Sequence, residues 1–208
     1  MANKANIVEG QALWAKVFEP DTKFDANGIY SINILVPETE AQEVCEYLDS
    51  VVKDKFEEEV KANPKKRNSL TTRPGYEPHL DQDGNKTDKV EFKIKLKALV
   101  QRRDGTTYAQ KPIVVDAKRT PMDKDTLIGN GSKVKAAFEA VPYVMASTKQ
   151  VGVSLRLKGV QVISLVEYGG TGGSMFEEEE GFVVSKTEKA STPFEDEVPE
   201  YAETEGDF

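Results

Sequence analysis

The sequence predicts a mainly β protein with one inserted helix and a polar, acidic C-terminal tail. Three observations support this prediction. Short β-branched and aromatic runs recur between residues 11 and 168, helical spacing of apolar residues is confined to 38–62, and the composition turns polar and acidic after a glycine cluster at 169–174. The turn signals Asn27-Gly28 and Asp104-Gly105 favour antiparallel hairpins over parallel crossovers.

The first third of the chain predicts two strands and the helix. Residues 29–36, IYSINILV, lie between the Asn27-Gly28 turn and Pro37, and a shorter strand is expected at 11–18. Over residues 38–62 the apolar side chains recur at helical spacing, with Glu and Lys on the other face. We therefore expect one amphipathic helix that ends at Asn63-Pro64.

Residues 63–89 are rich in proline and glycine and predict a long loop, which in a compact domain is usually functional or mobile. From Lys61 to Arg73 the chain carries five basic residues and no acid. This basic run could close over a polyanion as an electrostatic flap, although a solvated loop would have the same composition.

Strands resume at Val90, where VEFKIKLKALV alternates apolar and charged residues. A hairpin at Asp104-Gly105, a strand after the turn at 128–132 and a β-rich stretch at 151–168, broken near Gly159, bring the total to six or seven strands. This pattern favours an OB-fold-like antiparallel barrel over residues 1–168, with a β-sandwich as the alternative. A Gly-rich linker at 169–176 and a disordered acidic tail at 177–208 are expected to follow.

The net charge of −8 is unevenly distributed. The segment 177–208 holds 12 of the 36 acidic residues and two of the 28 basic ones, so residues 1–176 carry a net charge of +2. Such asymmetry is typical of nucleic-acid-binding proteins and of interaction tails.

Several classes of function find no support in the sequence. No apolar run is long enough for a membrane span, and no signal peptide precedes the first strand, so we expect a cytoplasmic protein. The single cysteine, Cys45, and single histidine, His79, do not make a zinc site. No catalytic or phosphate-loop motif is present, and we expect neither enzymatic activity, nor a cofactor, nor a metal.

The most informative local feature is a comb of three lysines, Lys93, Lys95 and Lys97, which project from one face of a strand about 6.6 Å apart. This spacing suits successive phosphates of an extended single strand, whereas the alternative is a solubilising sheet face. Exposed aromatics would stack on bases, and we expect Tyr143 at a loop entrance because Pro142 should break its strand. The candidate DNA-binding residues are Lys93, Lys95, Lys97, Lys65, Lys66, Arg67, Arg102, Arg103, Tyr143, Trp14 and Tyr76.

The end of the chain is the second strong feature. From Ser191 onward there are seven acidic residues, no basic one, and a terminal Phe208. Acidic charge with a hydrophobic end is suited to docking into a basic pocket on a partner. The candidate partner-binding residues are Phe208, Asp207, Glu205 and Glu203.

Taken together, these segments resemble the single-stranded DNA-binding proteins of short-tailed lytic bacteriophages. The resemblance rests on WAKVFEPDTKF, GIYSINILVP, EEEVKANP, EFKIKLKA, IVVDAKR, GNGSKVK and VPY, in this order, and on the acidic tail that ends in Asp-Phe.

The resemblance implies an OB-fold core that binds single-stranded DNA independently of sequence and anneals strands in replication, recombination and repair. It implies a tail that contacts the replicative DNA polymerase and the primase-helicase, competes for the DNA groove and supports a homodimer. Lys93 and Lys95 would match the basic strand, Tyr143 the stacking tyrosine and Phe208 the terminal aromatic.

Two other functions remain open from the residues alone. The first is a non-enzymatic protein-interaction or virion structural β-domain with an acidic docking tail. The second is a nuclease that would hold metal through Asp81, Asp83, Asp116 or Asp123. Salt-dependent DNA affinity, measured with and without magnesium, would separate the three.

Overall fold

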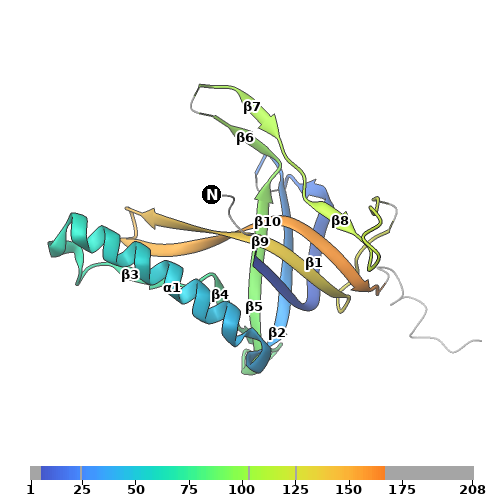
Figure 1. Ribbon diagram of the computed structural model, residues 1–208, viewed down its shortest axis with the longest axis horizontal. Helices are drawn as coiled ribbons and strands as arrows, with labels where there is room; N and C mark the ends of the chain where they lie inside the picture. Colours follow the sequence, from blue (N-terminus) through green and yellow to red (C-terminus); the bar gives the residue numbers. More distant parts are fainter. Residues whose placement is uncertain (1–5, 24, 103, 125, 167–208) are drawn as a thin grey trace, which may run out of the picture. The chain divides into compact units, whose positions relative to one another are not determined.

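The computed structural model describes residues 6–23, 25–102, 104–124 and 126–166 (Figure 1). All of them belong to the first of two units of the chain, Met1–Thr171, whereas the second unit, Gly172–Phe208, lies wholly outside the described residues. The predicted linker at 169–176 and the predicted tail at 177–208 therefore lie outside them, together with Arg103.

The described elements are strands except for one α-helix and one short 3₁₀ turn. In chain order they are β1 (Asn6–Asp21), β2 (Ile29–Pro37), α1 (Glu38–Ala62), η1 (Pro64–Lys66), β3 (Thr71–Arg73), β4 (Tyr76–Leu80), β5 (Lys86–Lys97), β6 (Leu99–Gln101), β7 (Thr107–Ala109), β8 (Ile113–Val115), β9 (Lys133–Met145) and β10 (Gln150–Ser164).

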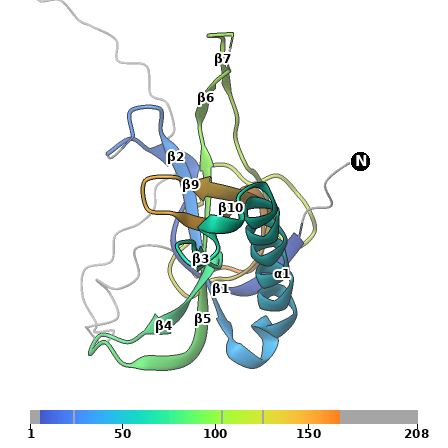
Figure 2. The ribbon, with the colours of Figure 1, turned by 90° about the vertical axis from the view of Figure 1, so that its left-hand side faces the viewer.

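Five of the strands close into a barrel. β9, β1, β2 and β5 pair in that order as antiparallel neighbours, and β10 joins β9 to β5 (Figure 2). The closing ladder between β10 and β5 is parallel, with Leu155 opposite Ile94. The predicted barrel is confirmed, but it is mixed, because direction reverses at each antiparallel ladder and five strands cannot all alternate around a closed ring.

The core confirms the predicted alternation along β5 and the predicted helix. Val90, Phe92, Ile94 and Leu96 of β5 are all buried. α1 lies alongside the barrel, contacts β9 and β10, and buries Ala41, Leu48, Val52 and Val60 (Figures 1 and 2). Among the described residues, no helix is long and apolar enough to cross a membrane.

The prediction of a loop over 63–89 is wrong. This segment contains η1, β3, β4 and the first residues of β5, and β4 pairs with β5 in a hairpin. The Asp81 carboxylate closes the turn by accepting hydrogen bonds from the backbone N–H groups of Asp83 and Asn85. β4 is an edge strand of the sheet, which is why it tolerates Pro78.

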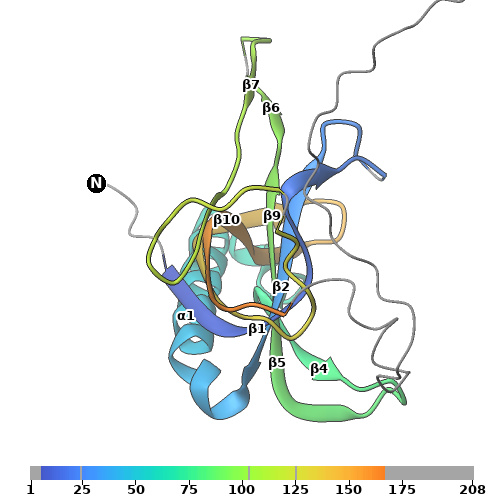
Figure 3. The same ribbon diagram turned by 90° about the vertical axis from the view of Figure 1, so that its right-hand side faces the viewer.

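The hairpin predicted at Asp104-Gly105 is confirmed. β6 and β7 form a separate two-stranded sheet, which projects away from the barrel (Figures 1 and 3). Its strands are each three residues long, and at its base the Gln110 backbone N–H donates a hydrogen bond to the Ala98 carbonyl. This hairpin therefore extends from the barrel, and β6 and β7 are not among the strands that form it.

Candidate nucleic-acid interface

An open groove of about 540 Å³ runs across one side of the barrel. Its lining includes residues of β4, β5, β9 and β10, Arg73 at the end of β3, and Pro74 and Gly75, which join β3 to β4. The basic residues in its lining outnumber the acidic ones, five to two. They are Arg73, Lys93, Lys95, Lys97 and Arg156, against Glu77 and Glu91.

The three predicted comb lysines all line this groove. Lys93, Lys95 and Lys97 are exposed and alternate along β5 with the buried Ile94 and Leu96. The alternation places their ammonium groups on one face at intervals of about 6.6 Å. The common face that the sequence predicted is therefore present, and its lysines open onto a groove.

Lys95 and Arg156 are direct neighbours in the parallel ladder that closes the barrel. Like charges at such positions normally repel each other and destabilise a sheet. Arg156 Nη1 is 3.6 Å from Glu139 Oε2, whereas Lys95 has no ion pair among the described residues. This pair of adjacent cations is suited to a polyanion.

Glu77 neutralises two other cations of the groove. Its Oε2 accepts a hydrogen bond from Lys93 Nζ at 2.6 Å, and its Oε1 accepts one from Arg73 Nη2 at 2.6 Å. Lys93 above all, and then Arg73, lowers the pKa of the Glu77 carboxyl, which is therefore ionised at neutral pH. The same contact raises the pKa of the Arg73 guanidinium.

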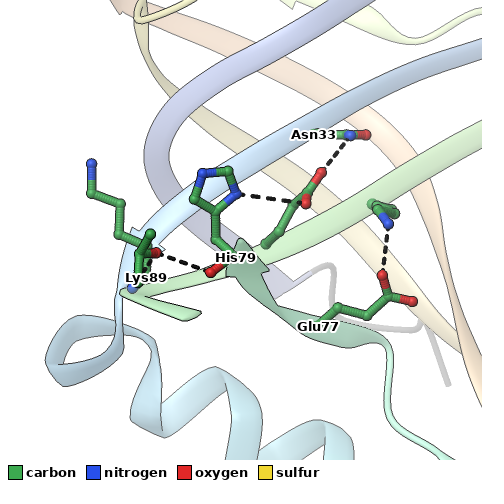
Figure 4. Close-up of polar contacts among 7 residues, drawn as sticks. Asn33, Glu77, His79 and Lys89 are labelled. Atoms are coloured by element: carbon green, nitrogen blue, oxygen red, sulfur yellow. Dashed lines mark hydrogen bonds and ion pairs between the residues drawn. The ribbon is translucent and has the colours of Figure 1, made fainter. Parts of the chain in front are cut away.

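The second acidic residue of the groove has different partners (Figure 4). Glu91 Oε1 accepts a hydrogen bond from Asn33 Nδ2 at 2.6 Å, and Glu91 Oε2 is 3.9 Å from His79 Nδ1. Figure 4 shows Glu77 separate from this cluster, with its own bond to a cation. The two carboxylates thus have separate sets of partners.

Tyr143 lies in the groove, but not at a loop entrance. β9 continues through Pro142 to Met145, so the predicted strand break is wrong. The β9–β10 ladder continues through this proline, with Pro142 opposite Val153 and Tyr143 opposite Gly152. A Cβ on Gly152 would come within 2.6 Å of Tyr143 Cζ and Oη, so the glycine leaves room for the ring.

Tyr76 lines the groove but is also a structural residue. It lies in β4 and not in a loop, with its ring centroid 6.1 Å from that of Phe92. Its hydroxyl is 3.1 Å from Asp49 Oδ2 of α1. Burial, followed by the bond to Asp49, raises the pKa of Tyr76 to about 12. Its contacts hold β4 to the helix and to the barrel.

Five predicted residues do not line the groove. Arg67 pairs with Glu57 at 2.8 Å and lies over the Phe56 ring, while Lys65 and Lys66 are exposed in η1. Arg102 stacks on Tyr108 in the projecting hairpin. Trp14 is 64% exposed beside a different hollow, with its backbone at a φ of 52° and its N–H bonded to Asn130 Oδ1.

Sequence reasoning did not select two basic residues of the groove. Arg73 was recognised only as a member of the basic run, because the predicted loop concealed β3 and β4. Arg156 lies between Leu155 and Leu157, so the segment SLRLK alternates like the comb in β5. That alternation was the signal that could have revealed it.

Within the described ranges no group of three or more His, Cys, Asp or Glu side chains could hold a metal ion. Burial raises the pKa of the Cys45 thiol to about 11, which disfavours the thiolate, and this partly buried residue packs against the core.

Comparison with known proteins identifies the family. A family model described as "Single-stranded DNA-binding protein, Bacteriophage T7" matches residues 10–165. The chain is 31% identical over 203 residues to the single-stranded DNA-binding protein of Escherichia phage T7, covering 87% of this chain and 85% of that protein. It is 28% identical over 196 residues to that of Enterobacteria phage T3, covering 86% and 82%.

Solved structures share the fold. The crystal structure of the T7 protein matches with a TM-score of 0.64 and 25% identity, over 87% of this chain and 100% of that chain. The protein of bacteriophage Enc34 in complex with single-stranded DNA matches with a TM-score of 0.50 and 13% identity, over 81% and 91%. The chain therefore belongs to the T7-type family of phage single-stranded DNA-binding proteins, which are not enzymes.

Proposed function

We propose that this member of the family binds single-stranded DNA in the groove between β4, β5, β9 and β10. The observation that carries the proposal is the neighbouring pair Lys95 and Arg156 in the closing ladder, with Tyr143 in the same groove. Cations attract the phosphates, and an aromatic ring offers a surface on which a base can stack.

Both kinds of contact are independent of base sequence. Every nucleotide carries a phosphate, and every base has a π-face. Lys93, Lys95 and Lys97 would follow the backbone along β5, while Tyr143 on β9 would take a base. We therefore expect similar affinity for oligonucleotides of different sequence, and a strong dependence on salt.

A titration of a fluorescent oligonucleotide at several salt concentrations tests the proposal. Lys95→Ala removes the groove cation that has no ion pair among the described residues, and Lys53→Ala on α1 is the matched control. Lys53 is also exposed, lies outside the groove, and undergoes the same loss of charge. Loss of affinity only in Lys95→Ala supports the groove. A protein-interaction or virion structural domain would show no salt-dependent affinity in any variant.

The proposed role in the infected cell is in DNA replication and recombination, in the host cytoplasm, where the protein would protect and anneal strands. Recruitment of a replicative DNA polymerase and a primase-helicase would fall to the acidic end of the chain. The sequence supports this, because residues 191–208 carry seven acidic residues, no basic one and the terminal Phe208.

Deletion of residues 191–208 tests this second role. The acidic segment would compete with DNA, so its loss should tighten DNA binding at low salt, with less effect as salt screens the charges. The same deletion, and Phe208→Ala alone, should abolish or weaken capture of the polymerase. Unchanged DNA affinity at low salt would contradict the competition.

A homodimer is also part of the proposal. Ile7 and Ile113 are 60% and 70% exposed, and they line a mainly apolar hollow of about 280 Å³ with Val160. Exposed apolar patches of this kind often mark contact surfaces between proteins. Sedimentation velocity of the intact chain and of Ile113→Lys tests this, since the variant should sediment as a monomer if the patch is the interface.

A further inference from the structure

The groove contains a carboxylate, that of Glu77, which bridges two of its cations. Glu77 presents one oxygen to Arg73 Nη2 and the other to Lys93 Nζ, each at 2.6 Å. We propose that Arg73 and Lys93 form one phosphate-binding site, and that Glu77 occupies this site until DNA displaces it. This inference rests on the proposed function, because it assigns a role within the same groove.

The geometry is that of an exchangeable contact. The side chains of Arg73, Lys93 and Glu77 are 56%, 44% and 38% exposed, so solvent and an incoming strand can reach all three. A phosphate, like a carboxylate, offers two or more oxygens to cations on either side. One phosphate could therefore take over both hydrogen bonds without moving the strands that carry Arg73 and Lys93.

Glu77 is not what holds β4 in place. Exposed ion pairs contribute little to stability, whereas Tyr76 anchors the same strand through Phe92 and Asp49. Glu77 also lies directly opposite Glu91 in the β4–β5 ladder, a position where like charges are unfavourable. Glu77 therefore disfavours the pairing of β4 with β5 and is not needed to anchor β4. Its contacts with the groove cations give a better reason for its presence.

Competition by Glu77 has a distinct effect on salt dependence. When DNA binds the intact chain, the displaced carboxylate remains beside the phosphate, so the site neutralises less phosphate charge than its two cations would alone. Without that carboxylate, binding should release more counterions, and the log–log slope should steepen by up to about 0.7. The gain in affinity relative to the intact chain should therefore grow by up to about fivefold per tenfold reduction in salt.

The experiment compares Glu77→Gln with Glu91→Gln in the oligonucleotide titration on the full chain. Both changes remove one negative charge from the same groove, but Glu91 contacts Asn33 and His79 instead of the groove cations. We expect Glu77→Gln to bind up to about fivefold more tightly at one tenth of the salt concentration, with a steeper slope. Glu91→Gln should gain clearly less, because the Glu91 carboxylate is not bonded to a groove cation. Equal gains in the two variants, or no gain in Glu77→Gln, would overturn the inference.

Two further variants separate this inference from the proposed function. In a Lys93→Ala background the gain from Glu77→Gln should shrink, since half of the shared site is gone; an undiminished gain would mean simple repulsion and overturn the inference. Lys95→Ala serves as the reference for the groove itself. If Lys95→Ala weakens binding while Glu77→Gln has no effect, only the role of Glu77 fails. If neither variant changes affinity, the groove is not the DNA site. Thermal melting of each variant checks the fold.

Discussion

Strand β5 and the basic run from Lys61 to Arg73 each carry five basic residues in the sequence, but the fold uses them differently. In β5 the three comb lysines, Lys93, Lys95 and Lys97, alternate with buried residues and all line one groove. In the basic run, Arg67 is paired with Glu57, Lys65 and Lys66 lie in η1, and only Arg73 lines the groove. A cation contributes to a binding surface when a rigid element fixes the direction of its side chain and when neighbouring cations point to the same side.

The contrast extends to the aromatic residues. Tyr143 is fixed in the groove by a ladder that continues through Pro142 and by the space over Gly152. Trp14 is more exposed, but it lies beside another hollow, outside the cationic surface. Exposure alone therefore does not identify a stacking platform, because a base must reach a ring and a cation together.

Tyr143→Ala should have the largest effect. Loss of a stacking ring costs about 1–3 kcal/mol of binding free energy, whereas Tyr143→Phe keeps the π-face and should cost little. Fluorescence titration measures both variants, with circular dichroism to verify folding. An Ala variant that folds and binds normally would remove Tyr143 from the site.

Lys95→Ala should have the second-largest effect on DNA binding, and a variant in the basic run serves as its control. The log–log slope of affinity against salt should fall by about 0.7 for the lost phosphate contact. Lys65→Ala, in η1, should leave the slope nearly unchanged. If Lys65→Ala lowers the slope as much as Lys95→Ala does, the distinction between the two regions is wrong.

Gly152→Ala should produce a smaller and more specific effect. The new methyl group would displace the Tyr143 ring, because the Cβ would come within 2.6 Å of it. DNA affinity should fall by less than in Tyr143→Ala, while Tm stays unchanged or rises, since Gly→Ala reduces the entropy of the unfolded chain. Normal affinity with a displaced ring would show that the ring's position is unimportant.

Tyr76→Phe should have the smallest effect on DNA. It keeps the ring in the groove and removes only the hydroxyl that contacts Asp49. We expect a loss of about 1 kcal/mol in the free energy of unfolding and little change in affinity, measured by urea denaturation and titration. A large loss of affinity with unchanged stability would instead place the Tyr76 hydroxyl in DNA contact.

The fold was predictable where one periodicity extends over many residues. The alternation in β5 and the helical spacing over 38–62 both correspond to the observed elements. β3 and β4 were missed because Pro74, Gly75 and Pro78 resemble loop punctuation. Pro74 and Gly75 do join the two strands, but Pro78 lies within β4, which tolerates it as an edge strand. The parallel ladder between β10 and β5 joins residues about sixty positions apart, which local turn signals do not reveal.

The site was predictable where charge and strand periodicity coincide, as in the comb of Lys93, Lys95 and Lys97. It was not predictable where the groove depends on register between distant strands. The pairing of Arg156 with Lys95 and the contact of Glu77 with Arg73 and Lys93 exist only once the barrel closes and β4 folds against β5.

Photo-crosslinking tests the central claim most directly. An oligonucleotide that carries bromodeoxyuridine would be irradiated in complex with the full chain, and the attached peptide would be identified by mass spectrometry. The groove predicts attachment at Tyr143 on β9, with loss of that adduct in Tyr143→Ala. Attachment at Trp14 or within residues 65–67, with Tyr143 unmodified, would contradict it.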